Sequence, residues 1–264
     1  MLALFGMAVL HTAANMLSDV FDFKRGLDRD VTPVSGSIVR GWLSPGQVAL
    51  GSALLFGIGA AIGLYLVWVT GRTLLIVGGV GLAIGLFYTV LKYHALGDLA
   101  VFLDFGLLGS LGAWIVQTGE FSWIPIIWTI PMAMLVVAIL HANNWRDSLS
   151  DRERRVVTVA SLLGDRSSLV YYGLLLFGSM AIVVGLVFVP RLGGAKGAAM
   201  PATFLVILLA LPRAMILWGR ARRRRNPRRP MDFIVLDGAT AHYTLVFGLL
   251  CTAAVWLDFI ILKL

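Results

Sequence analysis

The chain has 264 residues, of which 59% are hydrophobic and only 14% are charged, and its formal net charge at pH 7 is +8. Soluble domains are typically about 45–50% apolar and about 25% charged, so this composition excludes a water-soluble globular protein. The single cysteine, Cys251, also excludes an intramolecular disulfide framework.

The apolar residues recur as blocks of about 18–23 residues, the length that a helix needs to cross a hydrocarbon core of about 30 Å. The blocks are continuously apolar and do not alternate, which argues against a strand-rich barrel. We therefore predict an all-α, polytopic transmembrane helical bundle that forms a single integral-membrane domain over residues 1–264. About eight spans are expected, at residues 1–17, 47–69, 72–91, 97–118, 124–143, 168–190, 198–219 and 241–262.

Basic residues are distributed unevenly over the two sides that eight alternating spans define. One side holds most of the 22 Lys and Arg residues: Lys24, Arg25, Arg29, Arg40, Lys92, Arg146, Arg152, Arg154, Arg155, Arg166 and the run from Arg220 to Arg229. The positive-inside rule makes this side cytoplasmic, and we expect an integral protein of the cell (inner) membrane. The arginine run between two spans is expected to meet anionic lipid headgroups and not nucleic acid, because it is short and has no interleaved aromatic residues.

Acidic residues gather on the same side, at the end of the first span. Asp19 and Asp22 are three positions apart and share a helix face, and Ser18 lies one turn before Asp22. Gly26 is expected to end the helix as a left-handed cap, which lets Asp28 fold back toward the same site.

A second acidic cluster follows the fifth span. Asn143, Asp147 and Asp151 are spaced at i, i+4 and i+8, so on a helix they lie within roughly 80° of one another. Carboxylates stacked in this way repel each other unless a cation lies between them. Oxygen ligands without His or Cys suit Mg²⁺, which is readily completed by phosphate oxygens, so the two clusters together suggest a Mg²⁺–diphosphate clamp. The alternative for either cluster is a solvated rim of salt bridges.

Other polar residues have two interpretations each. Lys92, which shares a face with Tyr88, either binds diphosphate or anchors its helix at the membrane surface. Arg146 either binds phosphate bidentately or pairs locally with Asp147 or Asp151. Asp98 begins the fourth span and is either functional or a helix N-terminal charge. Two further candidates are Asp104 and His141. Asp104 is an ionisable group inside a span and is either functional or a packed, protonated acid. His141 is either a base or a structural hydrogen-bonding group.

Several stretches carry a family pattern: Ser18-Asp19-Val-Phe-Asp22-Phe-Lys24-Arg25-Gly26-Leu-Asp28; Leu140-His141-Ala-Asn143-Asn144-Trp-Arg146-Asp147-Ser-Leu-Ser-Asp151; Tyr88-Thr89; Leu96-Gly97-Asp98-Leu99; and Thr240-Ala-His242. With these motifs the chain resembles the UbiA-type intramembrane prenyltransferases, and most closely the branch that prenylates 1,4-dihydroxy-2-naphthoate in menaquinone biosynthesis, together with its animal relatives. The resemblance covers nearly the whole chain, and the second motif is the most specific part of it.

The resemblance implies a transferase that moves a polyprenyl group from an allylic polyprenyl diphosphate to an aromatic acceptor such as 1,4-dihydroxy-2-naphthoate, at a Mg²⁺ site. The implied metal ligands are Asp19, Asp22, Asp28, Asp147 and Asp151. The implied substrate-binding residues are Ser18, Tyr88, Lys92, Asn143, Asn144 and Arg146, and the implied catalytic residues are Lys92, Asp98 and Arg146. The expected partners are the two substrates and membrane lipid, with no nucleic acid.

The sequence departs from the family pattern at two points. Ser18 stands where the family has Asn, and the first of the family's nine helices has no counterpart. We expect Met1 to be internal to a longer product; the alternative is a degenerate, catalytically impaired paralogue. A transporter of divalent cations or organic anions is a rival interpretation, but the acids lie at helix ends and not at the bilayer midplane. Within the enzyme class, 4-hydroxybenzoate, homogentisate, a porphyrin or a glycerol phosphate lipid are alternative acceptors.

Overall fold

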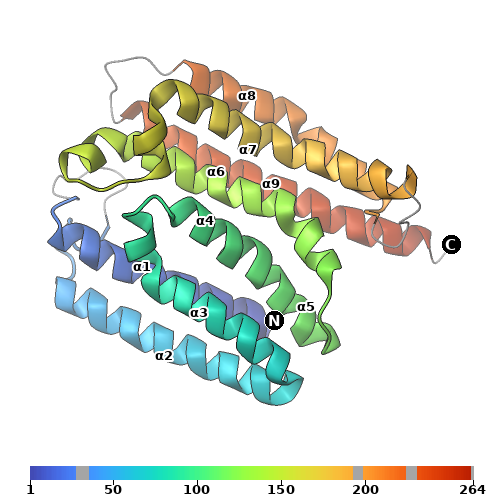
Figure 1. Cartoon of the computed structure of the whole chain (residues 1–264), viewed down its shortest axis with the longest axis horizontal. Coiled ribbons are helices and arrows are strands. Elements are labelled where there is room, and N and C mark those ends of the chain that lie inside the picture. The colour runs from blue at the N-terminus through green and yellow to red at the C-terminus, as the bar shows by residue number, and fades with distance from the viewer. Residues whose placement is uncertain (28–35, 193–198, 224–230, 263–264) are drawn as a thin grey trace.

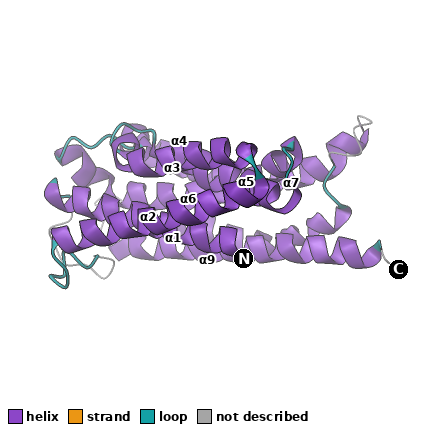
Figure 2. Ribbon diagram, turned by 90° about the horizontal axis from the view of Figure 1, so that it is seen from below, coloured by secondary structure: helices purple, strands orange, loops and turns teal. Residues whose placement is uncertain are grey.

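The computed structural model describes the whole chain except residues 28–35, 193–198, 224–230 and 263–264. In chain order the elements are α1 (Leu2–Lys24), α2 (Pro45–Thr70), α3 (Arg72–Lys92), α4 (Gly97–Val101), the π-helix η1 (Phe102–Leu108), α5 (Gly109–Thr118), α6 (Trp123–Glu153), α7 (Val159–Leu192), the 3₁₀ helix η3 (Ala202–Ala210), α8 (Leu211–Arg222) and α9 (Met231–Ile261). The described residues contain no strand, and their helices lie side by side along a common direction (Figure 2). The all-α prediction is confirmed.

Eight of the helical segments in the described residues are long and apolar enough to cross a membrane. They coincide with the eight predicted spans, so the polytopic architecture is confirmed. The largest differences are at polar helix ends: α1 continues to Lys24 and α6 to Glu153, past the predicted ends at residues 17 and 143, and α9 begins at Met231, before the predicted start at residue 241. A span predicted from hydropathy stops where apolar residues stop, whereas a helix continues into the polar interface. Helix α7 begins earlier than predicted, at Val159, and bends at Gly164, whose φ is +68°.

Two groups of helices are joined by the fourth span (Figure 1). Helices α1, α2 and α3 pack against one another, and α6, α7 and α9 form the second group together with η3 and α8. The span made of α4, η1 and α5 packs on α3 on one side and on α6 on the other. The ends of α1, α3, α6 and α8 therefore come together, and we call this end, marked by Lys24, Lys92, Arg152 and Arg222, the basic end of the bundle.

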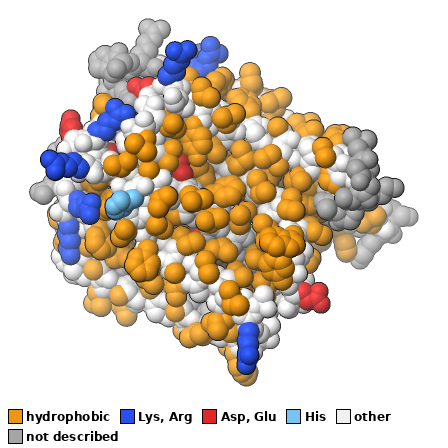
Figure 3. Space-filling view, viewed as in Figure 1, with side chains coloured by type: hydrophobic (Ala, Val, Ile, Leu, Met, Phe, Trp, Pro, Cys, Tyr) orange, Lys and Arg blue, Asp and Glu red, His pale blue; other side chains and the backbone are white. Residues whose placement is uncertain are grey.

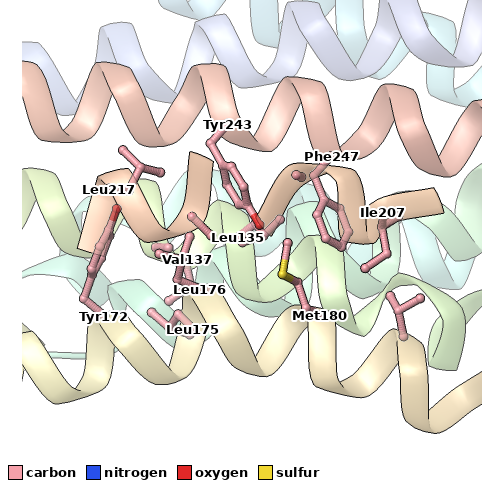
Figure 4. Packing of buried hydrophobic residues seen from close by; sticks show 14 of the residues in the cluster. Leu135, Val137, Tyr172, Leu175, Leu176, Met180, Ile207, Leu217, Tyr243 and Phe247 are labelled. Atoms are coloured by element: carbon pink, nitrogen blue, oxygen red, sulfur yellow. The ribbon is translucent and has the colours of Figure 1, made fainter. Parts of the chain in front are cut away.

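The largest apolar core lies within the second group, where side chains of α6, α7, η3 and α9 interdigitate (Figure 4). Leu135, Leu176 and Phe247 are completely buried there. The Tyr172 hydroxyl makes a 2.7 Å hydrogen bond with Thr240 Oγ1, which ties α7 to α9 and satisfies both polar groups.

The outer surface is mostly apolar, and most of the visible Lys and Arg side chains gather at the basic end (Figure 3). Large side chains such as Trp68 and Leu209 are 81% and 71% exposed. An apolar surface of this extent matches a hydrocarbon environment and not water. The protein is therefore an integral membrane protein.

The first acidic motif ends in a helix cap of the predicted kind. Gly26 has a φ of +71°, its N–H donates to the Phe23 carbonyl, and the Leu27 N–H donates to the Asp22 carbonyl, both at 2.9 Å. This double pattern is a Schellman motif, which favours glycine because a Cβ disfavours positive φ. The cap fixes the backbone of Asp22 at the last turn of α1.

Glycine also allows the fourth span to approach α6. A Cβ built on Gly106 would lie 2.2 Å from the Cβ of Ala133. Small residues at such a crossing let two membrane helices come close enough for their backbones to pack.

We predict that Gly106→Ala destabilises the bundle by about 1–3 kcal/mol, because η1 and α6 must move apart to admit the methyl group. Thermal unfolding in detergent measures the effect. Gly78→Ala on α3 is the matched control, since a Cβ there meets nothing within 4 Å and alanine is the better helix former. Equal stabilities of the two variants would contradict the close approach of η1 and α6.

Candidate functional site

Asp22 is the centre of a buried polar cluster at the basic end. Asp22 is 7% exposed as a whole residue, and its carboxylate accepts hydrogen bonds from Lys92 Nζ at 3.0 Å and from the Tyr93 hydroxyl at 2.6 Å. The Ser18 hydroxyl, one turn earlier on α1, donates to the same carboxylate at 3.4 Å. The guanidinium of Arg25 lies 4.2 Å from the centre of the Tyr93 ring. The last turns of α1 and α3 are therefore joined through one acid.

The second motif surrounds Arg146 near the end of α6. The guanidinium donates to both oxygens of Asp147, at 2.9 and 3.0 Å, and also to Asn143 one turn earlier and to Asp237 on α9. The helix carries Asn143, Asp147 and Asp151 along one side, as the i, i+4, i+8 spacing predicts. The local pair of Arg146 with Asp147, one of the two predicted alternatives, is present in this structure.

Asp151 connects the two motifs electrostatically. Its side chain is buried, and burial together with the negative charges of Asp147 and Asp22 raises the pKa of Asp151 to about 7, although Lys92 and a hydrogen bond from Thr158 act in the opposite direction. The charges of Asp22 and Lys92 act on Asp151, so the ends of α1, α3 and α6 face one region. Negative charge is in excess around Asp151, and a bound cation would compensate it.

The loops at the basic end hold these helices in register. The segment after α3 pairs with the segment between α6 and α7: the Ala95 N–H donates to the Val157 carbonyl at 2.6 Å, and the Val157 N–H donates to the Tyr93 carbonyl at 3.2 Å. Arg152 Nε donates to the Ser161 carbonyl at 2.8 Å. These contacts join the Lys92–Tyr93 pair to the end of the second motif.

Asp98 and His141 form a second polar group, deeper in the bundle. Asp98 in the first turn of α4 is 5% exposed, and its Oδ2 lies 3.7 Å from Nδ1 of the completely buried His141 on α6. The ring of Tyr171 on α7 meets the His141 ring edge-on, with a 4.8 Å separation of centres. Three helices thus bring their polar groups together.

The other predicted residues have different surroundings. Tyr88 lies close enough to Lys92, Asp98 and Asp22 for their charges to act on it, so it is near both the Asp22 cluster and the Asp98–His141 group. Asp19 is exposed, with its carboxylate beside Gly36. Asn144 is buried, Asp104 is half-buried beside Gly81, and Asp28 lies outside the described residues.

Sequence reasoning missed Tyr93, Tyr171 and Asp237. Tyr93 directly follows Lys92, but nothing in its type distinguishes it from an interfacial tyrosine. Asp237 lies inside α9, but the predicted span began at residue 241 and left it out. With the earlier helix start it would have been noticed as an acid inside a span. Tyr171 follows from no pattern, because its ring meets His141 only when α7 packs against α6.

The residues at the basic end suit Mg²⁺, although they do not form a closed cage. Among the described residues no group of three His, Cys, Asp or Glu side chains is close enough to hold a metal ion without help. Mg²⁺ commonly binds through one or two carboxylates and takes its remaining ligands from water and substrate phosphates. Asp22, Asp147 and Asp151 supply such carboxylates, and burial, followed by the negative charges of Asp147 and Asp22, raises the pKa of Asp151. The donor set therefore fits.

The chain belongs to the UbiA prenyltransferase family, which it matches over residues 1–236. It is 37% identical over 176 residues to UbiA prenyltransferase domain-containing protein 1 of Danio rerio, and the aligned region covers 64% of this chain and 52% of that protein. It is 34% identical over 247 residues to the Mus musculus protein of the same name, and the aligned region covers 91% of this chain and 68% of that protein. It is also 30% identical over 265 residues to 1,4-dihydroxy-2-naphthoate octaprenyltransferase of Bacillus subtilis (strain 168), covering 97% and 80%. The chain spans about half the length of the zebrafish relative, and the expected family is confirmed.

We predict a pH dependence of stability for the metal-free protein. The pKa of Asp151 in the fold, about 7, is above its ordinary value of 3.8, so the ionised form is the destabilising one and stability falls as pH rises between these values. Asp151→Asn should remove that loss, which thermal unfolding in detergent with a chelator measures. Asp258→Asn, toward the other end of α9, is the control and should keep the wild-type pH profile. An unchanged profile in Asp151→Asn would contradict the assignment.

Proposed function

We propose that this protein transfers a polyprenyl group from an allylic polyprenyl diphosphate to an aromatic acceptor, 1,4-dihydroxy-2-naphthoate, in menaquinone biosynthesis. One observation carries the proposal: Asp22, Lys92 and Asp151, from three helices, act on one another at the polar end of an otherwise apolar bundle. Membership of the UbiA prenyltransferase family supports the same activity. The alternatives, a transporter or an inactive paralogue, are not better supported by these findings.

The diphosphate of the donor would bind at the basic end. Asp22, Asp147 and Asp151 would hold Mg²⁺, with Asp19 and Asp28 as further members of the first motif. When bound, Mg²⁺ neutralises negative charge on the leaving diphosphate and so lowers the barrier to ionisation. Asn143, Asn144 and Ser18 would support this set.

Two cations of the chain can act on the same group. Lys92 lies against Asp22, where its ammonium would donate to a diphosphate oxygen and shift from its carboxylate partner. Arg146 is held between Asp147 and Asp237, with its guanidinium plane fixed by both carboxylates. Four of its five N–H groups already donate to Asp147, Asp237 and Asn143, so Arg146 would contact a phosphate through the remaining N–H or by exchanging one of these partners.

The apolar interior serves the reactive prenyl group. Ionisation of the allylic carbon–oxygen bond leaves a carbocation that water would trap, so the chemistry needs a water-poor site. Aromatic rings at the boundary, such as Tyr88 and Phe102, supply π-faces that stabilise a cation. The chain of the donor would extend between helices toward lipid.

The chemical identity of the acceptor is the more specific part of the proposal. The relative in Bacillus subtilis is named for 1,4-dihydroxy-2-naphthoate, and this chain covers 80% of it. The second motif and Leu96-Gly97-Asp98 are the residues that resemble the naphthoate-prenylating branch. The basic end would face the cytoplasm of a cell with an inner membrane, which follows from the positive-inside rule.

We predict that Asp22→Asn and Asp147→Asn each lower prenyl transfer by about 100-fold or more, because each removes a carboxylate that would hold the Mg²⁺ that neutralises the leaving diphosphate. The assay uses membranes with Mg²⁺, radiolabelled polyprenyl diphosphate and 1,4-dihydroxy-2-naphthoate. Asp258→Asn is the control and should retain wild-type activity. Full activity in the Asp22→Asn/Asp147→Asn double variant would rule out the metal assignment. No product from correctly folded wild-type protein would rule out the proposed enzymatic activity.

We also predict a preference among acceptors. With the donor held constant, 1,4-dihydroxy-2-naphthoate should give a kcat/KM at least tenfold above that of 4-hydroxybenzoate or homogentisate, since discrimination by one ring's contacts is worth about 1–3 kcal/mol. Chromatography of the prenylated products measures the ratio. A higher kcat/KM for a single-ring acceptor would refute the naphthoate assignment and leave prenyl transfer standing.

A further inference from the structure

Arg146 lies between two carboxylates that hold different parts of its guanidinium group. Asp147, the next residue on α6, accepts hydrogen bonds from Nε at 2.9 Å and from Nη2 at 3.0 Å. Asp237 on α9 accepts from Nη1, and Asn143 accepts from Nη2. The Nε–Nη2 edge is a fork that fits two oxygens of a carboxylate or of a phosphate. In this structure Asp147 therefore occupies an edge through which Arg146 could bind a phosphate.

The two carboxylates differ in how firmly they are held. The side chain of Asp147 is 41% exposed, whereas that of Asp237 is 16% exposed. Both carboxylate oxygens of Asp237 have a partner, because Oδ2 accepts from Arg146 and Oδ1 accepts from the Gly238 N–H at 2.7 Å. An exposed carboxylate can turn away from Arg146 and be solvated or bind a cation, but a buried one would lose its counter-charge in an apolar environment. Asp147 is therefore the partner that Arg146 can exchange, and Asp237 is the one that it keeps.

The exchange follows from the role of Asp147 in the proposed function. Asp147 is one of the carboxylates that would hold Mg²⁺, and a carboxylate that turns toward a cation gives up part of its pairing with Arg146. The Nε–Nη2 edge can then donate to two oxygens of the diphosphate in place of the two oxygens of Asp147. The guanidinium keeps the same number of charge-assisted hydrogen bonds, and no covalent bond forms or breaks.

Asp237 determines where the guanidinium stays during this exchange. The side chain of Arg146 is long, and once Asp147 has turned away only Asn143 and Asp237 restrict it. A guanidinium that lost Asp237 as well would follow Asp147 or take several rotamers, and ordering it again on the substrate costs conformational entropy. Asp237 holds only Nη1, so it restrains the group without covering the fork.

The Arg146–Asp237 pair is not needed to hold α6 and α9 together. The two helices also pack further along α9, where a Cβ built on Gly248 would lie 3.2 Å from Cε of Met132. A substitution at Asp237 leaves Arg146 paired with Asp147. Effects of such a substitution on substrate binding can therefore be separated from effects on folding.

We propose that Asp237 is a positioning residue, which retains Arg146 while Arg146 exchanges Asp147 for the diphosphate of the prenyl donor. The proposal rests on the proposed function, because it assigns a further residue to that diphosphate site. It adds α9 to the helices that shape the site, through an acid that belongs to neither of the two acidic motifs.

The test measures binding of inorganic diphosphate in the presence of Mg²⁺ to detergent-solubilised protein by calorimetry, so it needs neither an acceptor nor turnover. Asp237→Ala should raise the diphosphate Kd about tenfold, because a hydrogen bond that orders a charged group is lost. Asp237→Asn keeps an acceptor oxygen and should raise the Kd less. Asp258→Ala, toward the other end of α9, is the matched control and should leave the Kd unchanged. Thermal unfolding checks that each variant is folded.

The sign of the change separates positioning from charge. A carboxylate that acted only through its negative charge would repel the diphosphate, so its removal would lower the Kd. An unchanged or lowered Kd in Asp237→Ala would therefore overturn the proposal and leave the proposed function standing.

A second variant shows whether Asp237 acts through Arg146. In an Arg146→Met background, Asp237→Ala should raise the Kd no further, because there is no guanidinium to position. An equal rise in both backgrounds would overturn the proposal, since Asp237 would then act on the fold or on the ligand by another route. Wild-type protein that binds no diphosphate in the presence of Mg²⁺ would overturn the proposed function and this proposal with it.

Discussion

The architecture depends on the compensation of buried carboxylates at one end of an apolar bundle. The buried Asp22 is satisfied by Lys92, Tyr93 and Ser18, and the partly exposed Asp147 is paired with Arg146. Removing one partner from such a set leaves an uncompensated charge, which is far more costly than never having buried the pair. Asp22 therefore fixes how α1 and α3 end relative to each other, and Arg146 joins α6 to α9 through Asp237. Asp151 is the exception, because its neighbours add negative charge to it.

That exception gives the fold its chemical capacity. A protein that needed only stability would replace Asp151 by an apolar or neutral residue, since burial beside Asp147 and Asp22 disfavours its ionised form. The same excess of negative charge becomes favourable when a divalent cation and a diphosphate are present. In the proposed reaction, the apolar walls would then surround the prenyl group and the carbocation. Prenyl transfer in a membrane requires a polar end that can bind the diphosphate and an apolar interior that can hold the prenyl chain.

Sequence patterns predicted the parts of the structure that depend on local periodicity. Eight spans, the Gly26 cap and the shared face of Asn143, Asp147 and Asp151 all follow from hydropathy or from the geometry of one helix. The partners of those residues do not, because they lie on other helices. Nothing local indicates that Tyr93 donates to Asp22 or that Asp237 receives Arg146.

The most direct test of the account is a double-mutant cycle on ligand binding. Asp22→Asn, Asp151→Asn and the double variant are titrated with farnesyl diphosphate in the presence of Mg²⁺, and the coupling free energy is taken from the four dissociation constants. If the two motifs hold one ligand, the effects are non-additive, with a coupling of about 0.5–3 kcal/mol. Additive effects, or no effect from either substitution, would show that the two aspartates do not share a ligand and would contradict the account.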